Sequence, residues 1–311
     1  MVASTSQSGS ALLNFSNTLA DAVETAGQSI VAVNARQRTS SSGVHWQAGV
    51  VVAADHTIER EDGITVTLPD GRTVPATLVG RDAGTDLAVL KIEGAGVPPA
   101  QLGDSATLKI GHVVLAVARP GESGVSASWG AISALGGPWR TWSGGQIDQL
   151  IRPDLTLYPG FSGGALIDAQ GQVVGIATSG LSRSLNLAIP TSTVHRVVDQ
   201  LLSGGRVARG YLGLAMQPVQ IPDSLKSALS ITNQSGLIVV HVETGGPGEQ
   251  AGMLVGDIVL ALNGQPMADT NDVQNVLDPD RVGQALPAQV IRGGQLKDLS
   301  LTVGERPRRG E

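Results

Sequence analysis

A serine flanked by glycines is the feature of this sequence that most limits how the chain folds. Residues 160–164 read Gly-Phe-Ser-Gly-Gly, and a strand, turn and strand pattern follows at 165–176. Glycine allows backbone conformations that are closed to other residues, so the chain can turn tightly beneath an exposed hydroxyl. Such a turn directs the N–H groups of Gly160 and Ser162 into one small space, as an oxyanion hole requires. The pentapeptide alone also fits an ordinary glycine-rich β-turn.

Two residues upstream supply what a serine nucleophile needs, namely a base and a partner that orients the base. His56 ends the apolar run 49–56, which is typical of a buried strand that delivers its last residue to a cleft. Asp86 opens a second apolar strand, where a carboxylate is costly unless it is paired. A histidine N–H would pair it. His56, Asp86 and Ser162 are therefore candidate members of one site.

The order of these residues separates two classes of hydrolase. His, Asp, Ser is the chymotrypsin order, whereas α/β-hydrolases have Ser, then the acid, then His. The Gly-x-Ser-x-Gly pattern at 160–164 also fits the nucleophile elbow of the α/β-hydrolases, which needs a helix after the serine. Because 165–176 has the pattern of two strands, an esterase of that class is disfavoured.

At this point the chain resembles the HtrA/Deg family of serine proteases, in which a trypsin-like domain precedes a PDZ domain. The resemblance rests on 50–56, 85–90, 160–166 and the PDZ motifs after 210, and it covers nearly the whole chain. It implies a mainly β fold, with a chymotrypsin-like double β-barrel protease domain followed by an α+β PDZ domain.

The resemblance also assigns roles to the candidate site residues. It makes His56 the general base, Asp86 its orienting partner and Ser162 the nucleophile, with the Gly160 and Ser162 N–H groups as the oxyanion hole. Two positions depart from the family pattern, because Asp55 precedes the histidine and Phe161 stands where the family usually has Asn. Both leave the triad in place and leave the level of activity open.

Substrate recognition is likewise implied by the resemblance. Thr156 and the segment 177–185 line the primary specificity pocket. The strand edge expected to pair with the substrate backbone is Ala177, Thr178 and Ser179. Arg183 is the only charged residue in this segment, so we expect small or medium aliphatic residues before the cleaved bond.

Regulation by peptides is a further implication. In PDZ domains of this family, a loop presents backbone N–H groups to the carboxylate at the end of a peptide, which then adds as a strand. Here that loop is Tyr211, Leu212, Gly213 and Leu214. Arg140 lies in a loop that senses such a ligand in the family, so it is either a sensor or an ordinary surface arginine.

The expected organisation follows the composition of the chain. Residues 1–10 are serine-rich and expected to be disordered, and an amphipathic helix runs from Ala11 to about Gly27. Leu12 and Phe15 on this helix either form an oligomer contact, as in the family's trimers, or pack on the barrel. The expected segments are an N-terminal tail and helix at 1–28, a protease domain at 29–203, a linker at 204–210, a PDZ domain at 211–304 and a basic tail at 305–311.

Charge and hydropathy exclude several partners. The formal net charge is −6 and the pI is about 5.4, which argues against a nucleic-acid partner. The longest apolar runs fall short of the 18 residues or more that a membrane span needs.

No export signal is recognised, which predicts a cytoplasmic protein, or an extracytoplasmic one if a signal has been trimmed. No cofactor and no metal are expected.

The leading functional hypothesis is a serine endopeptidase that cleaves unfolded or misfolded proteins in protein quality control. Its expected partners are those substrates, C-terminal peptides at the PDZ domain, and further copies of the chain in a homotrimer or a multiple of trimers. The alternative hypothesis is a peptide-binding or holdase protein whose proteolytic centre is latent or weak.

Overall fold

The chain folds into two compact units, Met1–Val207 and Ala208–Glu311, and each is considered by itself. The computed structural model describes residues 5–94, 96–121, 124–182, 184–207, 210–277 and 281–305, with side chains from residue 10 onward. Arg183, residues 208–209 of the expected linker, and 306–311 of the expected basic tail lie outside the described residues.

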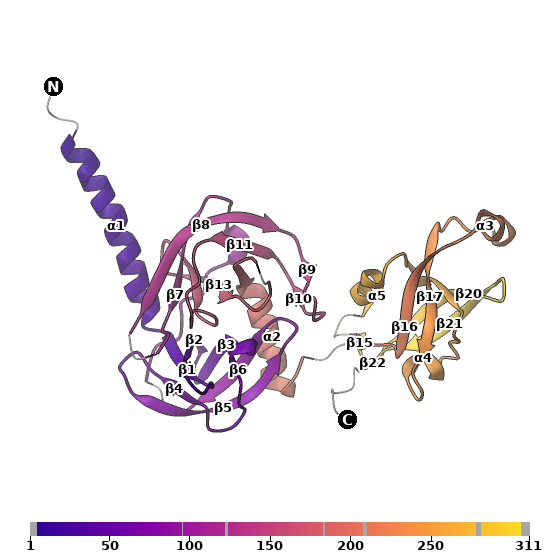
Figure 1. Ribbon diagram of the computed structural model, residues 1–311, viewed down its shortest axis with the longest axis horizontal. Helices are drawn as coiled ribbons and strands as arrows, with labels where there is room; N and C mark the ends of the chain where they lie inside the picture. The colour runs from indigo at the N-terminus through magenta and orange to yellow at the C-terminus, as the bar shows by residue number, and fades with distance from the viewer. Residues whose placement is uncertain are drawn as a thin grey trace. The chain divides into compact units, whose positions relative to one another are not determined.

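Two closed antiparallel β-barrels form the body of the first unit (Figure 1). Around the first barrel the strands follow the order β1 (Ile30–Asn34), β2 (Ser41–Gln47), β3 (Val50–Ala54), β6 (Leu87–Ile92), β5 (Thr73–Asp82) and β4 (Thr65–Thr67). Around the second they follow the order β11 (Leu150–Asp154), β14 (Leu187–Pro190), β13 (Val173–Thr178), β12 (Ala165–Asp168), β7 (Val113–Ala118) and β8 (Ser126–Gly136). This arrangement confirms the expected double-barrel fold.

One hydrophobic core joins the two barrels. Val52 and Leu87 of the first barrel are fully buried in the same cluster as Val117 and Ile167 of the second. Strands β3 and β13 are buried along their whole length, because one face fills a barrel and the other packs against neighbouring elements. The loops at the ends of these strands therefore start from rigid positions.

The elements before and after the barrels differ in part from expectation. Helix α1 (Thr5–Gly27) begins within the segment that was expected to be disordered. Extending a helix by one residue is much easier than nucleating it, so the amphipathic part can carry the polar residues before it into helical conformation. The segment 34–45 is polar in sequence, yet it contains most of β2, whose Ser41 and Ser42 are buried.

The remaining elements of the first unit are a hairpin, two 3₁₀ turns and a helix. They are η1 (Asp55–Thr57), η2 (Ser105–Thr107), β9 (Trp139–Arg140), β10 (Gln146–Ile147) and α2 (Thr191–Gly204). Gly205 caps α2 in the left-handed region, with φ +69°, so the helix extends into the expected linker. His195 of α2 is exposed, and its ring meets the Trp46 ring edge-on, with the ring centroids 5.0 Å apart.

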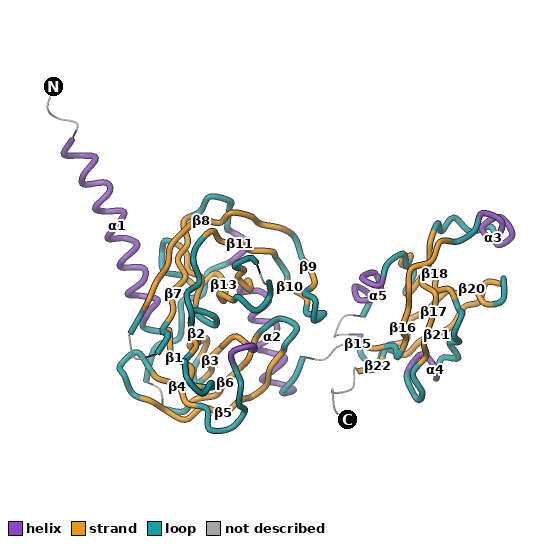
Figure 2. The backbone as a smooth tube through the Cα atoms, viewed as in Figure 1, coloured by secondary structure: helices purple, strands orange, loops and turns teal. Residues whose placement is uncertain are grey.

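A single antiparallel sheet organises the second unit, with helix α5 against its first strand (Figure 2). The sheet order is β16 (Leu214–Gln220), β17 (Ser235–Val242), β18 (Ile258–Leu262), β20 (Ala285–Arg292) and β21 (Gln295–Thr302), and β19 (Gln265–Pro266) pairs with β18. Three helices accompany the described part of the sheet, α3 (Asp223–Leu229), α4 (Pro247–Gln250) and α5 (Thr270–Val276).

A short strand pair closes the second unit. Strand β15 (Gly210–Tyr211) is antiparallel to β22 (Gly304–Glu305), so Gly210 lies opposite Glu305. Gly210 was expected in the linker and Glu305 in the tail, but both belong to the sheet structure of this unit. The sequence missed this pairing because two-residue strands carry no hydrophobic periodicity.

Candidate active site

The pairing of two strands brings His56 to Asp86. In the first barrel, Ala54 at the end of β3 lies opposite Leu87 at the start of β6. The residues just beyond this pair therefore meet, and the Asp55 amide donates to the Asp86 carbonyl at 3.1 Å. Asp86 adopts φ +59°, a left-handed conformation that is uncommon outside glycine.

The Asp86 carboxylate accepts both N–H groups of His56. The backbone N of His56 lies 2.9 Å from Oδ1, and the ring Nδ1 lies 2.9 Å from each carboxylate oxygen. Because a carboxylate accepts at this contact, Nδ1 carries the proton and Nε2 is left with its lone pair. The Asp86 side chain is buried, whereas the His56 side chain is about a third exposed, at 33%. The geometry is that of a base held in one tautomer.

Thr178 completes the environment of the Asp86 carboxylate. Its hydroxyl donates to Asp86 Oδ2, and the Gly180 amide in turn donates to the Thr178 hydroxyl at 2.9 Å. The sequence suggested Thr178 as a substrate contact, but the residue is fully buried and its side chain is committed to Asp86. No sequence signal distinguished these roles, since the two residues are far apart in the chain.

Ser162 lies in the tight turn that the glycines predicted. Gly160 and Gly163 have φ +86° and +87°, and a Cβ on Gly163 would lie 2.2 Å from the Ser42 carbonyl oxygen. The Ser42 hydroxyl donates to the Gly160 carbonyl at 2.7 Å and accepts from the Arg119 amide at 2.9 Å. Ser42 thus ties the turn to the first barrel, a role that the sequence did not reveal.

The backbone amides of this turn differ in whether they donate a hydrogen bond. Those of Phe161, Gly163 and Gly164 donate to backbone carbonyls at 2.9–3.0 Å. Within the described part of the chain, the amides of Gly160 and Ser162 have no acceptor. These are the two donors expected to form an oxyanion hole.

The Ser162 hydroxyl is hydrogen-bonded to Ser179 in this structure. Its Oγ lies 3.1 Å from the Ser179 Oγ and accepts from the Ser179 amide at 3.3 Å. Among the described residues, no hydrogen bond joins Ser162 Oγ to the His56 ring. The hydroxyl of Ser162 and the ring of His56 are therefore not hydrogen-bonded to each other in this structure, and each has another partner, Ser179 for Ser162 and Asp86 for His56.

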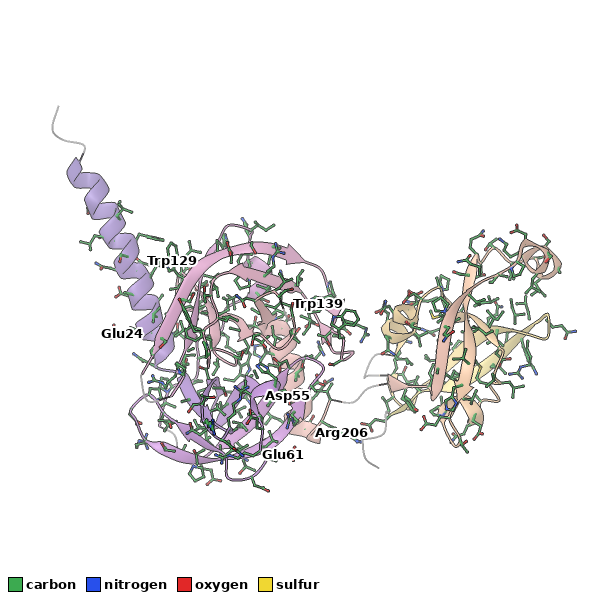
Figure 3. All side chains as sticks on the ribbon, viewed as in Figure 1. Glu24, Asp55, Glu61, Trp129, Trp139 and Arg206 are labelled. Carbon is green, nitrogen blue, oxygen red and sulfur yellow. The ribbon has the colours of Figure 1, made fainter. Side chains whose placement is uncertain are left out.

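The two departures from the family pattern have structural explanations. The Asp55 carboxylate turns to Arg81, with Nε at 2.5 Å from Oδ1, and Arg81 also donates to the Asp55 carbonyl at 3.2 Å (Figure 3 labels Asp55). Burial raises the pKa of Asp55 above its usual value, although Arg81 opposes the shift. Phe161 is buried and packs edge-on against Tyr158, with ring centroids 5.5 Å apart.

Three other predicted site residues differ in their access to the cleft. Thr156 is exposed, and its amide donates to the Ser128 hydroxyl at 3.2 Å. Ala177 is buried, and its N–H and C=O both bond within the barrel, to Gly164 and Gly163. Ala177 therefore offers no free edge to a substrate, which corrects the expectation. The exposed residues of this segment begin at Ser179, directly after strand β13.

The hairpin that carries Arg140 packs next to the site. The Thr141 hydroxyl donates to the Gly84 carbonyl at 2.7 Å, two residues before Asp86. A Cβ on Gly145 would lie 2.1 Å from the Gly84 carbonyl carbon, so the two loops are in direct backbone contact. Arg140 itself is half-buried and donates to the Gly144 carbonyl at 3.4 Å. A displacement of the hairpin would thus reach the loop that holds Asp86.

In the second unit, the loop 211–214, which was expected to bind the carboxylate of a peptide, has backbone N–H groups available for a ligand. The carbonyls of Leu212 and Gly213 accept from Gly248 and Glu243 at 2.7 and 2.8 Å. Their own amides have no acceptor in the described residues. Gly213 has φ +68°, which allows the loop to turn its N–H groups to one side. Such a nest of amides suits an anionic group.

The side chains do not suggest a metal site. In the described ranges, no cluster of three or more His, Asp or Glu residues has the spacing of metal ligands.

Comparison with protein-family models matches both units. A model described as a trypsin-like peptidase domain matches residues 41–176, and one described as a PDZ domain matches residues 210–303. The two matches are consecutive and together account for most of the described chain.

Curated relatives match most of this chain over part of their own length. A probable periplasmic serine endoprotease, DegP-like, from Pseudomonas savastanoi pv. phaseolicola is 36% identical over 268 residues, which cover 85% of this chain and 55% of the relative. The protein of the same name from Halomonas elongata is 33% identical over 277 residues, covering 88% of this chain and 57% of the relative. The chain thus spans about half the length of these relatives.

Solved structures resemble most of the chain. The HtrA-type protease AlgW with a decapeptide superposes with a TM-score of 0.76 at 31% identity, covering 94% of this chain and 99% of that one. The serine endoprotease from Yersinia pestis gives a TM-score of 0.76 at 32% identity, covering 93% and 98%.

The names of the relatives correct the expected location. They describe periplasmic proteins, which contradicts a cytoplasmic assignment. That assignment rested on failure to recognise an export signal in the sequence. Across the described segments, no helix has the length and apolar character needed to span a membrane.

Proposed function

Because this chain belongs to the HtrA family of trypsin-like serine endoproteases with a PDZ domain, we propose that it hydrolyses peptide bonds through Ser162. The observation that carries the proposal is the contact of His56 with Asp86 at 2.9 Å, beside a turn whose Gly160 and Ser162 amides are open. A nucleophile, an oriented base and oxyanion donors are the parts that acyl transfer needs.

The reaction follows from these positions. His56 Nε2 takes the proton of Ser162 Oγ as the oxygen attacks the substrate carbonyl carbon, and Asp86 stabilises the imidazolium that forms. The carbonyl oxygen becomes an oxyanion that accepts hydrogen bonds from the Gly160 and Ser162 amides. His56 then returns the proton to the leaving amine. A water molecule, activated by the same histidine, releases the acyl group from Ser162.

The proposed substrates are unfolded proteins, and the proposed regulators are peptides with a free carboxylate. We assign the enzyme to the cleavage of unfolded proteins outside the cytoplasm, with small or medium aliphatic residues before the cleaved bond. Peptides with a free carboxylate bind at 211–214 and control the first unit. The exposed Leu12, Leu13 and Phe15 of α1 support assembly into a trimer, because apolar side chains left in water favour contact with other copies.

A second candidate function is a peptide-binding protein with a weak proteolytic centre. The observation that favours it is the hydrogen bond of Ser162 Oγ to Ser179, which leaves the nucleophile uncoupled from His56. A protein that stays in this state would bind unfolded chains without cleaving them. The two functions differ in whether peptide binding switches the reaction on.

Incubation with casein tests both functions. Wild type should cleave casein, and Ser162→Ala should lower the rate by about 10⁴-fold or more. The matched control is Ser203→Ala, which removes an exposed hydroxyl at the end of α2 and should keep the wild-type rate. Cleavage by Ser162→Ala at the wild-type rate would refute the assignment. Absence of cleavage by wild type, even with added apolar C-terminal peptides, would favour the binding protein.

A further inference from the structure

The first strand of the second unit's sheet, β16, has a free edge. It pairs with β17 on one side and stands at the end of the sheet order. Within the register, Gln217 lies opposite Ile238 and Val219 opposite Gly236. The next pair outward is Ile221 with Gln234, joined by a hydrogen bond from the Ile221 amide to the Gln234 carbonyl at 3.0 Å.

This register decides which residues of β16 face the free edge. Antiparallel strands exchange hydrogen bonds at every second residue. Since Ile221 bonds toward β17, Val219 and Gln217 do so as well. The alternate residues Met216, Pro218 and Gln220 therefore turn their backbone groups to the free edge. The register shifts between Ala215 and Met216, but the Glu243 amide donates to the Gly213 carbonyl at 2.8 Å. Gly213 thus also bonds toward the β17 side, and Leu214 faces the free edge.

Proline at one of these positions removes a donor. Pro218 has no N–H, so the free edge offers donors at Met216 and Gln220 but only a carbonyl at Pro218. Edge strands tolerate proline when its nitrogen faces outward, and such a residue limits pairing with an added strand. The pairing capacity of the edge is therefore continuous only from Leu214 to Met216.

From this geometry we infer that Pro218 limits the recognised part of a bound peptide to its last three or four residues. The inference rests on the proposed binding of C-terminal peptides. The open amides of Leu212 and Gly213 lie at the start of the same strand and fix the position of the carboxylate. Apolar side chains of β16 and α5, including Leu214, Met216 and Val276, belong to one cluster that suits an apolar last residue.

Counting back from the carboxylate gives the register of the peptide. The last residue lies opposite Leu214 and donates its N–H to the Leu214 carbonyl. The third residue from the end lies opposite Met216 and exchanges two hydrogen bonds with it. The fifth from the end lies opposite Pro218, where its carbonyl finds no donor. Residues beyond the fourth therefore add little to the affinity.

A length series of peptides tests this inference. Unlabelled peptides of three to seven residues, with the same apolar last residue and alanine elsewhere, compete with a fluorescent heptapeptide for the full chain carrying Ser162→Ala. With Pro218 present, affinity should rise to four residues and change less than about twofold beyond them. Pro218→Ala restores a donor, so pentapeptides and longer ones should gain about two- to tenfold, while the tetrapeptide should not change.

Two controls separate the donor from other effects of removing a proline. Gln217→Ala alters the neighbouring exposed side chain but no free-edge donor, so its length dependence should match that of wild type. A hexapeptide with an ester between its fifth- and fourth-from-last residues has a weaker acceptor at the carbonyl opposite position 218. It should lose the gain in Pro218→Ala and behave as its amide parent does with Pro218.

The outcomes distinguish this inference from the function on which it rests. Equal length dependence in wild type and Pro218→Ala would overturn the role of Pro218 while leaving peptide binding intact. A gain that persists with the ester peptide would also overturn it, since the new donor would not be responsible. Failure of every peptide to bind would overturn the proposed binding function, and the inference with it.

Discussion

The Thr178 hydroxyl donates a hydrogen bond to the Asp86 carboxylate, which also holds both N–H groups of His56. Replacing Thr178 by valine keeps the shape and removes the donor from a buried carboxylate. The loss of about one such hydrogen bond corresponds to roughly a tenfold fall in kcat for casein or a peptide substrate. Thr178→Ser retains the hydroxyl and should keep most of the activity. Equal activity of the valine and serine variants would contradict the role of the hydroxyl.

Gly180 is expected to be sensitive to substitution, although it carries no functional group. A Cβ at this position would lie 2.5 Å from both Asp86 Oδ2 and His56 Nδ1. Gly180→Ala should therefore displace the base and lower kcat about 100-fold or more, because small misplacements near the reacting groups are costly. Gly204→Ala is the matched control, since its Cβ would meet nothing within 4 Å. Circular dichroism should show both variants folded.

Ser179 is predicted to restrain the nucleophile. The hydrogen bond between the Ser162 and Ser179 hydroxyls is 3.1 Å long and engages Ser162 Oγ with a partner other than His56. Ser179→Ala removes this partner, so the rate of Ser162 labelling by a fluorophosphonate should rise about fivefold without any activating peptide. This probe reports the nucleophile rather than substrate pairing. A slower reaction than wild type would show that Ser179 supports catalysis instead.

The Asp257–Arg292 pair predicts acid sensitivity of the second unit. Burial acts to raise the pKa of Asp257, but the Arg292 guanidinium at 2.6–2.7 Å and the Leu254 amide outweigh it and lower the pKa. The folded carboxyl thus binds protons less readily than the unfolded one. Its stabilisation is present above pH ~4, the usual range of an Asp, and is lost as pH falls through the folded-state pKa.

Hydrogen exchange of β18 measures this effect in the full chain. At pH 7, Asp257→Asn should lower the opening free energy of the second unit by about 2 kcal/mol, because it breaks a charged hydrogen-bonded pair with a buried carboxylate. The difference from wild type should shrink on acidification below the folded-state pKa. Asp298→Asn on the exposed face of β21 serves as control and should change little. A constant difference at all pH values would argue against the linkage.

Local motifs made the two-domain fold and the candidate triad predictable. Glycine spacing around Ser162, the apolar run before His56 and the acid that opens a strand at Asp86 are each contained in a few residues. The strand patterns of the barrels are local in the same sense. The structure then brings His56 into contact with Asp86, and it leaves the Gly160 and Ser162 amides open as the glycine turn predicted.

Other expectations failed where the contact that decides a residue's role is made with a residue far away in the chain. Ser42 lies in a polar stretch that gives no sign of a strand, yet it is buried and holds the Gly160 carbonyl. Ala177 looked like a substrate edge, but both of its backbone groups are used inside the barrel. Gly210 and Glu305 looked like linker and tail, and they pair with each other across almost the whole second unit.

The sequence by itself determined which residues are candidates for the chemistry, because glycine turns, apolar runs and the missing N–H of Pro218 are properties of single residues and their neighbours. Only the tertiary structure decided how those residues are coupled. The Thr178 hydroxyl donates a hydrogen bond to Asp86, which lies 92 positions away in the chain. The Ser162 hydroxyl forms its hydrogen bond with Ser179 and not with His56. The physical reason is that hydrogen-bond partners depend on distances of about 3 Å. Such distances between remote residues are set by the packing of both barrels together, and no local pattern encodes them.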